Sequence, residues 1–183
     1  MAPAVNPNAR LTLITGPARS GKTQLAVQWA LSFHAPRAYI ATAQNRDAEM
    51  AERIRRHQEE RGTAFQTYEE PLDLSVLLKK LSGSASITLV DCLTLWVSNL
   101  LGDLGEHSAE IKPPLDDLLK ELKNFKTPII LIGNEVGWGI VPDNPLARTF
   151  RDISGRLQQE IARMADQVIL MVAGIPLIVK GKQ

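Results

Sequence analysis

The segment Gly16-Pro-Ala-Arg-Ser-Gly-Lys-Thr23 has the residue types and spacing that hold the phosphates of a nucleoside triphosphate. Glycines let backbone N–H groups turn inward around phosphate oxygens, where a side chain would clash. Lys22 is expected to reach the β- and γ-phosphates, and the Thr23 hydroxyl to bind Mg²⁺. This pattern is a P-loop, and it predicts a phosphate site made by Gly16, Pro17, Ala18, Arg19, Ser20, Gly21, Lys22 and Thr23.

Asp91 is a second candidate for phosphate chemistry. It ends the apolar run Ile87–Val90, which reads as a buried strand. A carboxylate at the carboxyl end of such a strand can hold Mg²⁺ directly or through water, so Asp91 is a predicted metal residue with Thr23. The alternative is an N-cap, because aspartate commonly starts the helix that follows a strand.

His57 is a candidate nucleophile on a segment, Asp47–Arg61, with a strong helical pattern. Met50, Ile54 and His57 fall on one stripe of that helix. Neutral imidazole has a nitrogen lone pair that can attack phosphorus, and Arg53 one turn earlier would bind phosphate and favour the neutral ring. The alternative is a packed histidine with no chemical role.

Short β-rich runs alternate with helical patterns along the chain, which is typical of βαβ units. The expected strands are Leu11–Thr15, Ala38–Thr42, Ser86–Asp91, Pro128–Gly133, Gln167–Val172 and Leu177–Val179. The expected helices are Lys22–Phe33, Asp47–Arg61, Leu72–Leu81, Leu115–Phe125 and Leu146–Met164.

The fold class expected is α/β, a single P-loop domain of RecA-like type with helices on both faces of a mostly parallel sheet. Continuous apolar strands favour burial on both faces. The last two strands are too close for a crossover and should form an antiparallel hairpin at one edge. Gly102–Pro114 reads as a loop. We expect residues 1–10 to be a flexible leader and residues 11–183 to be the domain.

Composition excludes several classes of protein. The 183-residue chain has a net charge of +1 without a basic block, so we expect no nucleic-acid partner. A single cysteine, Cys92, rules out a disulfide within the chain and a zinc site built from cysteines. No run approaches the roughly 18 apolar residues of a membrane span. We therefore expect a cytoplasmic protein.

Four blocks of sequence resemble the bifunctional adenosylcobinamide kinase / adenosylcobinamide-phosphate guanylyltransferase family of cobalamin biosynthesis. Together they cover the chain from Leu11 to about Lys180, and the last two are the most specific. The blocks are the P-loop from Thr15 to Thr23, Tyr39–Ala43 leading to Arg53-Ile-Arg-Arg-His57, Leu89–Leu101, and Asn134–Pro142 with Arg148, Arg151, Asp152, Gly155 and Arg156.

The resemblance implies two reactions and a set of site residues. The enzyme would phosphorylate adenosylcobinamide with ATP or GTP, and then transfer GMP from GTP to that phosphate through a guanylylated His57. It also implies Mg²⁺ and a homotrimer. Beyond the P-loop, the implied nucleotide contacts are Thr42, Ala43, Gln44, His57, Gln58, Glu59, Glu60, Glu69 and Asp91. Glu69 is a candidate reader of guanine or ribose, and the alternative is a solvated charge beside Glu70.

Several roles stay open from the sequence. Trp138 could lie against the corrinoid or in a subunit contact, and Glu135 could shape the acceptor or metal site. Arg148, Arg151 and Arg156 could clamp phosphates or form a solvated helix face, whereas Cys92 and Trp96 read as core. Two other functions compete: a P-loop kinase of another small alcohol, and a non-catalytic or motor-type nucleotide-binding module. No Asn-Lys-x-Asp guanine motif of signalling GTPases is present.

Overall fold

The computed structural model describes residues 8–44, 62–105 and 110–181, together with Asn6, Glu52 and Arg55. Most of the predicted helix over residues 47–61 lies outside the described residues. The predicted site residues His57, Gln58, Glu59 and Glu60 lie outside them as well.

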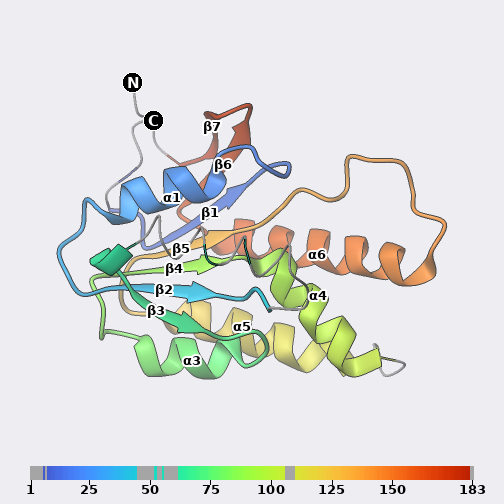
Figure 1. Ribbon diagram of the computed structural model, residues 1–183, viewed down its shortest axis with the longest axis horizontal. Coiled ribbons are helices and arrows are strands. Elements are labelled where there is room, and N and C mark those ends of the chain that lie inside the picture. The colour runs from blue at the N-terminus through green and yellow to red at the C-terminus, as the bar shows by residue number, and fades with distance from the viewer. Residues whose placement is uncertain are drawn as a thin grey trace.

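The described chain forms a seven-stranded sheet with the order β3-β2-β4-β5-β1-β6-β7 (Figure 1). Six strands run parallel and β7 runs antiparallel at one edge, as the sequence predicts. The carboxyl ends of the six parallel strands therefore lie on one side of the sheet, and the residues that follow each strand gather there. The strands are β1 (Leu11–Thr15), β2 (Arg37–Ala41), β3 (Gln66–Glu69), β4 (Ile87–Asp91), β5 (Ile129–Ile132), β6 (Gln167–Val172) and β7 (Ile175–Lys180).

Helices cover both faces of the sheet, as predicted. Helix α1 (Lys22–Ala30) packs on one face, and α3 (Leu74–Leu81), α4 (Leu93–Leu104), α5 (Lys112–Asn124) and α6 (Pro145–Met164) pack on the other. Successive strand residues alternate between these faces: Leu89 joins the core under α1, and Val90 joins the core under the other helices. The burial of whole strands explains why their sequences are continuously apolar.

Three elements differ from the sequence prediction, and α4 was not among the helices that it expected. Strand β3 was not predicted, because it is a short edge strand whose side chains are largely exposed and polar. The predicted loop Gly102–Pro114 was wrong at both ends, since α4 continues to Leu104 and α5 begins at Lys112. The two prolines that suggested a loop occupy the first turn of α5, where a missing N–H breaks no helical hydrogen bond.

The antiparallel hairpin of β6 and β7 is confirmed, and β7 is longer than the predicted Leu177–Val179. Ala173 and Gly174 join the strands, and both have positive φ, 50° and 81°. Positive φ at both central residues is the geometry that matches the twist of a two-residue hairpin. The N–H of Gly174 donates to the carbonyl of Ser20, so the hairpin turn lies against the P-loop.

Candidate active site

The P-loop connects the end of β1 to the start of α1, as the sequence requires. Gly16 has φ +144°, and a Cβ there would lie 2.5 Å from the carbonyl oxygen of Met171 in β6. Gly21 has φ +91° and is the residue before α1. Since no described side chain caps α1, its first N–H groups and its positive dipole end are left for an anion. Only glycine suits both positions, which explains their spacing.

The side chain of Lys22 lies inside this turn and is 6% exposed. Its ammonium donates hydrogen bonds to the carbonyl oxygens of Gly16 at 3.0 Å and Pro17 at 2.6 Å. A cation is thus fixed among the backbone groups that phosphate oxygens would approach. This placement matches the expected role of Lys22 in binding the β- and γ-phosphates.

Asp91, Thr23 and Tyr39 meet at the carboxyl ends of β2 and β4. One carboxylate oxygen of Asp91, Oδ2, accepts hydrogen bonds from the Thr23 hydroxyl at 2.9 Å and the Tyr39 hydroxyl at 2.6 Å. The other oxygen, Oδ1, accepts no hydrogen bond from the part of the chain that the structure describes. Asp91 does not cap α4, whose N-cap residue is Cys92.

These oxygens fit Mg²⁺, which prefers one or two protein ligands alongside phosphate oxygens and water. Thr23 and Asp91 supply a hydroxyl and a carboxylate from two different elements, already joined to each other. Sequence reasoning missed Tyr39, which orients the carboxylate. A buried tyrosine at the centre of β2, two residues before the strand's end, was the available signal, since its hydroxyl needs a partner.

Thr42 is completely buried, and its hydroxyl donates to the carbonyl of Cys92 and accepts from the Cys92 N–H, both at 2.8 Å. Asn99 of α4 donates to the Thr42 carbonyl at 2.7 Å. These bonds join the end of β2 to the start of α4 and thereby support Asp91. A direct contact of Thr42 with nucleotide stays a prediction.

The remaining predicted contacts lie along the same edge where they are described. Ala43 and Gln44 follow β2, and Glu69 ends β3 in register with Ala41 of β2. The P-loop, Ala43, Gln44, Glu69 and Asp91 are thus all at the carboxyl edge of one sheet. The position of His57 relative to them is outside the described residues.

Gln158 of α6 is a site residue that sequence reasoning missed. Its carbonyl oxygen accepts from the Thr15 hydroxyl at 2.7 Å, and its amide donates to the carbonyl of Asn134 at 3.1 Å. It thus links the end of β1, where the P-loop begins, to the end of β5. A Cβ at Gly133 would lie 2.5 Å from the carbonyl oxygen of Gln158, so the glycine makes room for this link.

Replacing Gln158 by leucine should lower the free energy of unfolding by about 2 kcal/mol, because two partly buried partners lose their hydrogen bonds. Urea denaturation monitored by circular dichroism measures this loss. The matched control is Gln159→Leu, which changes an exposed neighbour on the same helix. Equal losses for the two variants would show that the link between β1 and β5 contributes nothing.

Cys92 and Trp96 belong to the core, as expected. Cys92 is 4% exposed, and burial, together with the nearby Asp91 carboxylate, raises the pKa of its thiol to about 12. A thiol with that pKa stays protonated near neutral pH and is a poor nucleophile. Trp96 is buried, and its indole N–H donates to the carbonyl of Leu72 at 2.8 Å.

The segment after β5 starts at the P-loop. The N–H of Glu135 donates to the carbonyl of Gly16 at 2.9 Å. Arg148 is bound to this segment, since its guanidinium donates to the carbonyls of Pro142 at 2.8 Å and Asp143 at 2.7 Å. Arg148 therefore stabilises the loop, a role that the sequence did not suggest.

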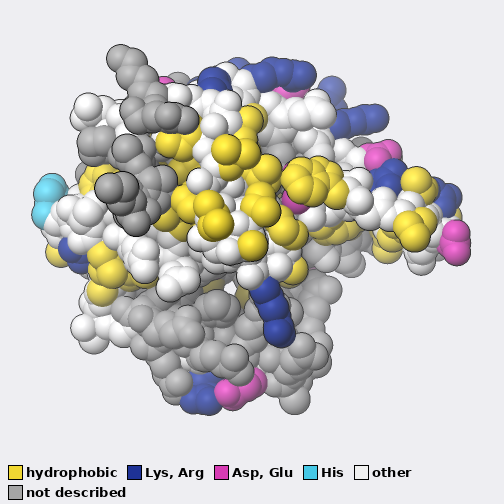
Figure 2. Space-filling view, turned by 90° about the horizontal axis from the view of Figure 1, so that it is seen from above, with side chains coloured by type: hydrophobic (Ala, Val, Ile, Leu, Met, Phe, Trp, Pro, Cys, Tyr) yellow, Lys and Arg dark blue, Asp and Glu magenta, His cyan; other side chains and the backbone are white. Residues whose placement is uncertain are grey.

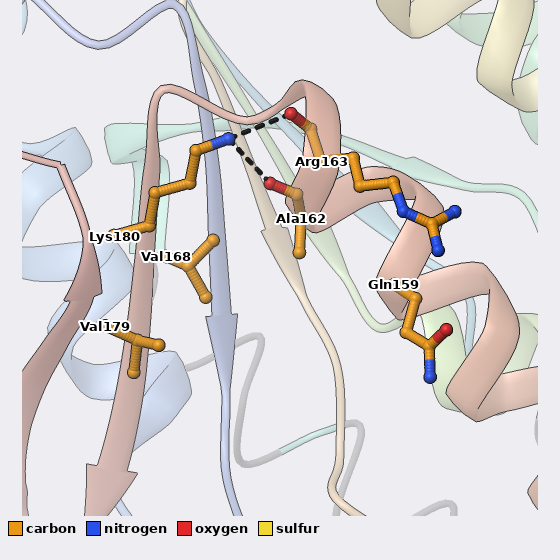
Figure 3. Close-up of a pocket in the computed structure, with 6 residues that line it drawn as sticks. All are labelled: Gln159, Ala162, Arg163, Val168, Val179 and Lys180. Atoms are coloured by element: carbon orange, nitrogen blue, oxygen red, sulfur yellow. Dashed lines mark hydrogen bonds between the residues drawn. The ribbon is translucent and has the colours of Figure 1, made fainter.

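A cavity of 490 Å³ lies away from these residues, between α6, the start of β6 and the end of β7 (Figure 3). The ammonium of Lys180 donates to the carbonyls of Ala162 and Arg163 there, each at 2.9 Å. These bonds satisfy the carboxyl end of α6. A smaller cavity of 250 Å³ shares Val168 with it and reaches Thr15 and Glu135.

Comparisons with known proteins agree with this arrangement. The family model for "Cobinamide kinase / cobinamide phosphate guanyltransferase" matches residues 12–179. The chain is 41% identical over 170 residues to the "Bifunctional adenosylcobalamin biosynthesis protein CobP" of Pseudomonas aeruginosa, covering 93% of this chain and 97% of that protein. It is 40% identical over 182 residues to the corresponding CobU of Salmonella typhimurium, covering 93% and 99%.

Among solved structures, the chain resembles the flagellar accessory protein FlaH from Methanocaldococcus jannaschii with a TM-score of 0.51. The sequences are 14% identical, and the match covers 94% of this chain and 79% of FlaH. At this identity the likeness concerns the α/β fold alone.

Proposed function

The chain belongs to the cobinamide kinase / cobinamide phosphate guanyltransferase family, and from this premise we propose that one P-loop site performs two successive transfers. As a member of that family the protein is a bifunctional enzyme of cobalamin biosynthesis that uses nucleoside triphosphates. The finer steps proposed are phosphorylation of adenosylcobinamide by ATP or GTP, and then transfer of GMP from GTP through His57.

One observation carries the proposal: Lys22, Thr23 and Asp91 converge on a preformed phosphate turn within a chain that the family matches over residues 12–179. In the first step, the hydroxyl oxygen of the acceptor attacks the γ-phosphorus, the bond to the bridging oxygen breaks, and a nucleoside diphosphate leaves. Lys22 and the backbone N–H groups bind the charge that develops on the phosphates.

In the second step, an imidazole nitrogen of His57 attacks the α-phosphorus of GTP and pyrophosphate leaves. A phosphate oxygen of the corrinoid then attacks the same phosphorus, and the phosphorus–nitrogen bond breaks to give adenosylcobinamide-GDP. Double displacement separates loss of pyrophosphate from attack by the corrinoid. The same cradle serves both steps, because each nucleotide presents its phosphate tail to it.

Mg²⁺ completes the proposal. Thr23 and Asp91 would hold it, since Oδ2 of Asp91 is bonded by Thr23 and Tyr39 and its Oδ1 accepts no hydrogen bond from the described residues. When bound, the ion neutralises phosphate charge and orients the triphosphate. Glu69, at the end of β3, is proposed to read guanine or ribose, since a carboxylate accepts the hydrogen bonds that guanine N1–H and N2–H₂ donate.

The proposed assembly is a homotrimer in the cytoplasm. Exposed apolar side chains on the hairpin support self-association: Val172, Ile175, Leu177 and Val179 are between 46% and 70% exposed. An edge strand with apolar side chains readily pairs with another chain. Among the described residues, no helix has both the length and the apolar character needed to cross a membrane.

The experiment that tests the function uses the full chain and GTP labelled at the α-phosphorus. After denaturation we expect a label on the protein that survives base and is lost in acid, as a phosphoramidate is. In a parallel incubation without denaturation, adenosylcobinamide and ATP are added to the enzyme and GTP. We expect adenosylcobinamide phosphate to form first and adenosylcobinamide-GDP later. Absence of both corrinoid products, or hydrolysis stimulated by nucleic acid instead, would overturn the proposal in favour of another P-loop function.

A further inference from the structure

The segment between β5 and α6, residues 134–144, is termed the arm below, and it carries apolar side chains into solvent. Trp138 is 70% exposed, Ile140 is 97% exposed and Val141 is 58% exposed. Figure 1 shows the arm leaving the carboxyl end of β5 and swinging out beyond the start of α6. Solvent-exposed apolar groups of this size mark a binding surface when they cluster.

Both ends of the arm are fixed. At its start, Asn134 receives a hydrogen bond from Gln158, and its own N–H donates to the Thr94 hydroxyl at 2.6 Å. At its end, the Asn144 side chain caps α6, and Arg148 holds the two carbonyls before it. The arm is thus anchored to the rest of the protein at both ends.

The arm begins at the phosphate turn. Glu135 is bonded to Gly16, and Trp138 follows Glu135 by three residues. Three residues span at most about 11 Å even when fully extended. Trp138 therefore belongs to the part of the arm nearest the phosphate turn, whereas Ile140 and Val141 lie farther along the chain.

Open space surrounds Trp138. A Cβ at Gly139 would meet nothing within 4 Å, and one at Gly137 would meet only the Glu135 carboxylate at 3.6 Å. Larger residues on either side would cover the indole faces. The glycines therefore leave room for a broad, flat group against the ring.

We infer that the arm is the platform for the corrin ring, with the Trp138 indole against one face of the macrocycle and Ile140 and Val141 along its rim. This inference rests on the proposed function. A corrin is a broad, partly saturated macrocycle, too large for the phosphate turn, with its reacting hydroxyl at the end of a flexible side arm. A platform beside the turn lets the hydroxyl reach the phosphate while the ring stays outside.

A second copy of the chain could occupy the arm in place of the corrin ring. The location of the exposed apolar residues indicates instead that the arm and the β6–β7 hairpin have separate roles. Of the ten large apolar side chains that are exposed among described residues, four are on the hairpin and four are Trp138, Ile140, Val141 and Leu146. Figure 2, which views the molecule from the top of Figure 1, shows hydrophobic side chains gathered on that face. The hairpin provides an edge strand for self-association, whereas the arm begins at the P-loop, where the acceptor must arrive.

The test compares Trp138→Ala with Leu177→Ala, a matched loss of an exposed apolar side chain on the hairpin. For Trp138→Ala we expect the KM for adenosylcobinamide to rise about tenfold, the loss typical of one aromatic stacking partner, with the KM for ATP unchanged. Trp138→Phe should recover most of the affinity, since it keeps an aromatic face. Leu177→Ala should leave the KM for adenosylcobinamide unchanged.

Two further measurements separate the possible failures. Labelling of the enzyme by GTP needs no corrinoid, so Trp138→Ala should be labelled like the unaltered chain. If the unaltered chain neither labels nor phosphorylates adenosylcobinamide, the proposed function fails. If it does both, and Trp138→Ala has an unchanged KM or a smaller mass in sedimentation equilibrium, only the platform is overturned.

Discussion

Lys22→Ala is expected to abolish both transfers, each falling by about 10²–10³-fold or more. Both reactions place a triphosphate in the same glycine turn, and the ammonium of Lys22 is the buried cation found there among the described residues. Without it, the charge that develops on the departing diphosphate or pyrophosphate is met only by the backbone N–H groups and the proposed Mg²⁺. Rates of formation of adenosylcobinamide phosphate and of labelled enzyme measure the two losses separately.

The control for this change is Lys79→Ala, which removes an exposed cation in the last turn of α3. Because the Lys22 ammonium also bonds the carbonyls of Gly16 and Pro17, circular dichroism and thermal unfolding must show that the variant still folds. A folded Lys22→Ala variant that keeps either activity near its original rate would mean that this activity uses a different phosphate site.

Sequence patterns predicted the parts of the fold that are governed by burial. Strands such as β4 and β5 are covered on both faces, so their composition alone reveals them. Strand β3 has no such pattern because its side chains face solvent, and its place in the sheet depends on pairing with β2. The start of α5 was misjudged because prolines break a helix in its interior but not in its first turn.

The candidate site divides in the same way. A P-loop is formed by residues that are close in sequence. Its glycines, lysine and threonine are therefore recognisable from their spacing within eight residues. Tyr39 is 52 residues from Asp91, and Gln158 is 143 residues from Thr15, so only the folded sheet brings each pair together. No sequence spacing predicts either residue, since each acts by orienting a group on another element: Tyr39 orients Asp91, and Gln158 bonds Thr15.

The contrast between Asp91 and Thr42 shows what geometry adds to a motif. Asp91 ends β4 and Thr42 follows β2 at the same side of the sheet, and the resemblance to the family implies a nucleotide contact for both. Asp91 accepts hydrogen bonds from Thr23 and Tyr39 at one carboxylate oxygen, and its other oxygen accepts none from the described residues. The Thr42 hydroxyl instead forms both of its hydrogen bonds with the backbone of Cys92, and these bonds hold the end of β2 in place. Chemical role follows from which partners a side chain has already bound.

His57→Asn is expected to separate the two activities. The labelled enzyme should disappear, and transfer of GMP should fall by about 10³-fold or more, because asparagine lacks the basic nitrogen that bonds to phosphorus. Phosphorylation of adenosylcobinamide should continue within about threefold of the original rate, since it depends on Lys22, Thr23 and Asp91 rather than on imidazole. Product analysis with ATP, then GTP, measures both.

His34→Asn is the matched control, because it exchanges a histidine that lies before β2, at the opposite end of that strand from Ala43 and Gln44. If His57→Asn still accepted an acid-labile GMP, another residue would be the nucleophile. If it lost phosphorylation as well, the residue would serve the shared triphosphate site and not the guanylyl step alone. We expect the two activities to respond differently because phosphoryl transfer can proceed directly to a positioned hydroxyl. Transfer of GMP through a covalent intermediate instead needs a nucleophile that the P-loop does not supply.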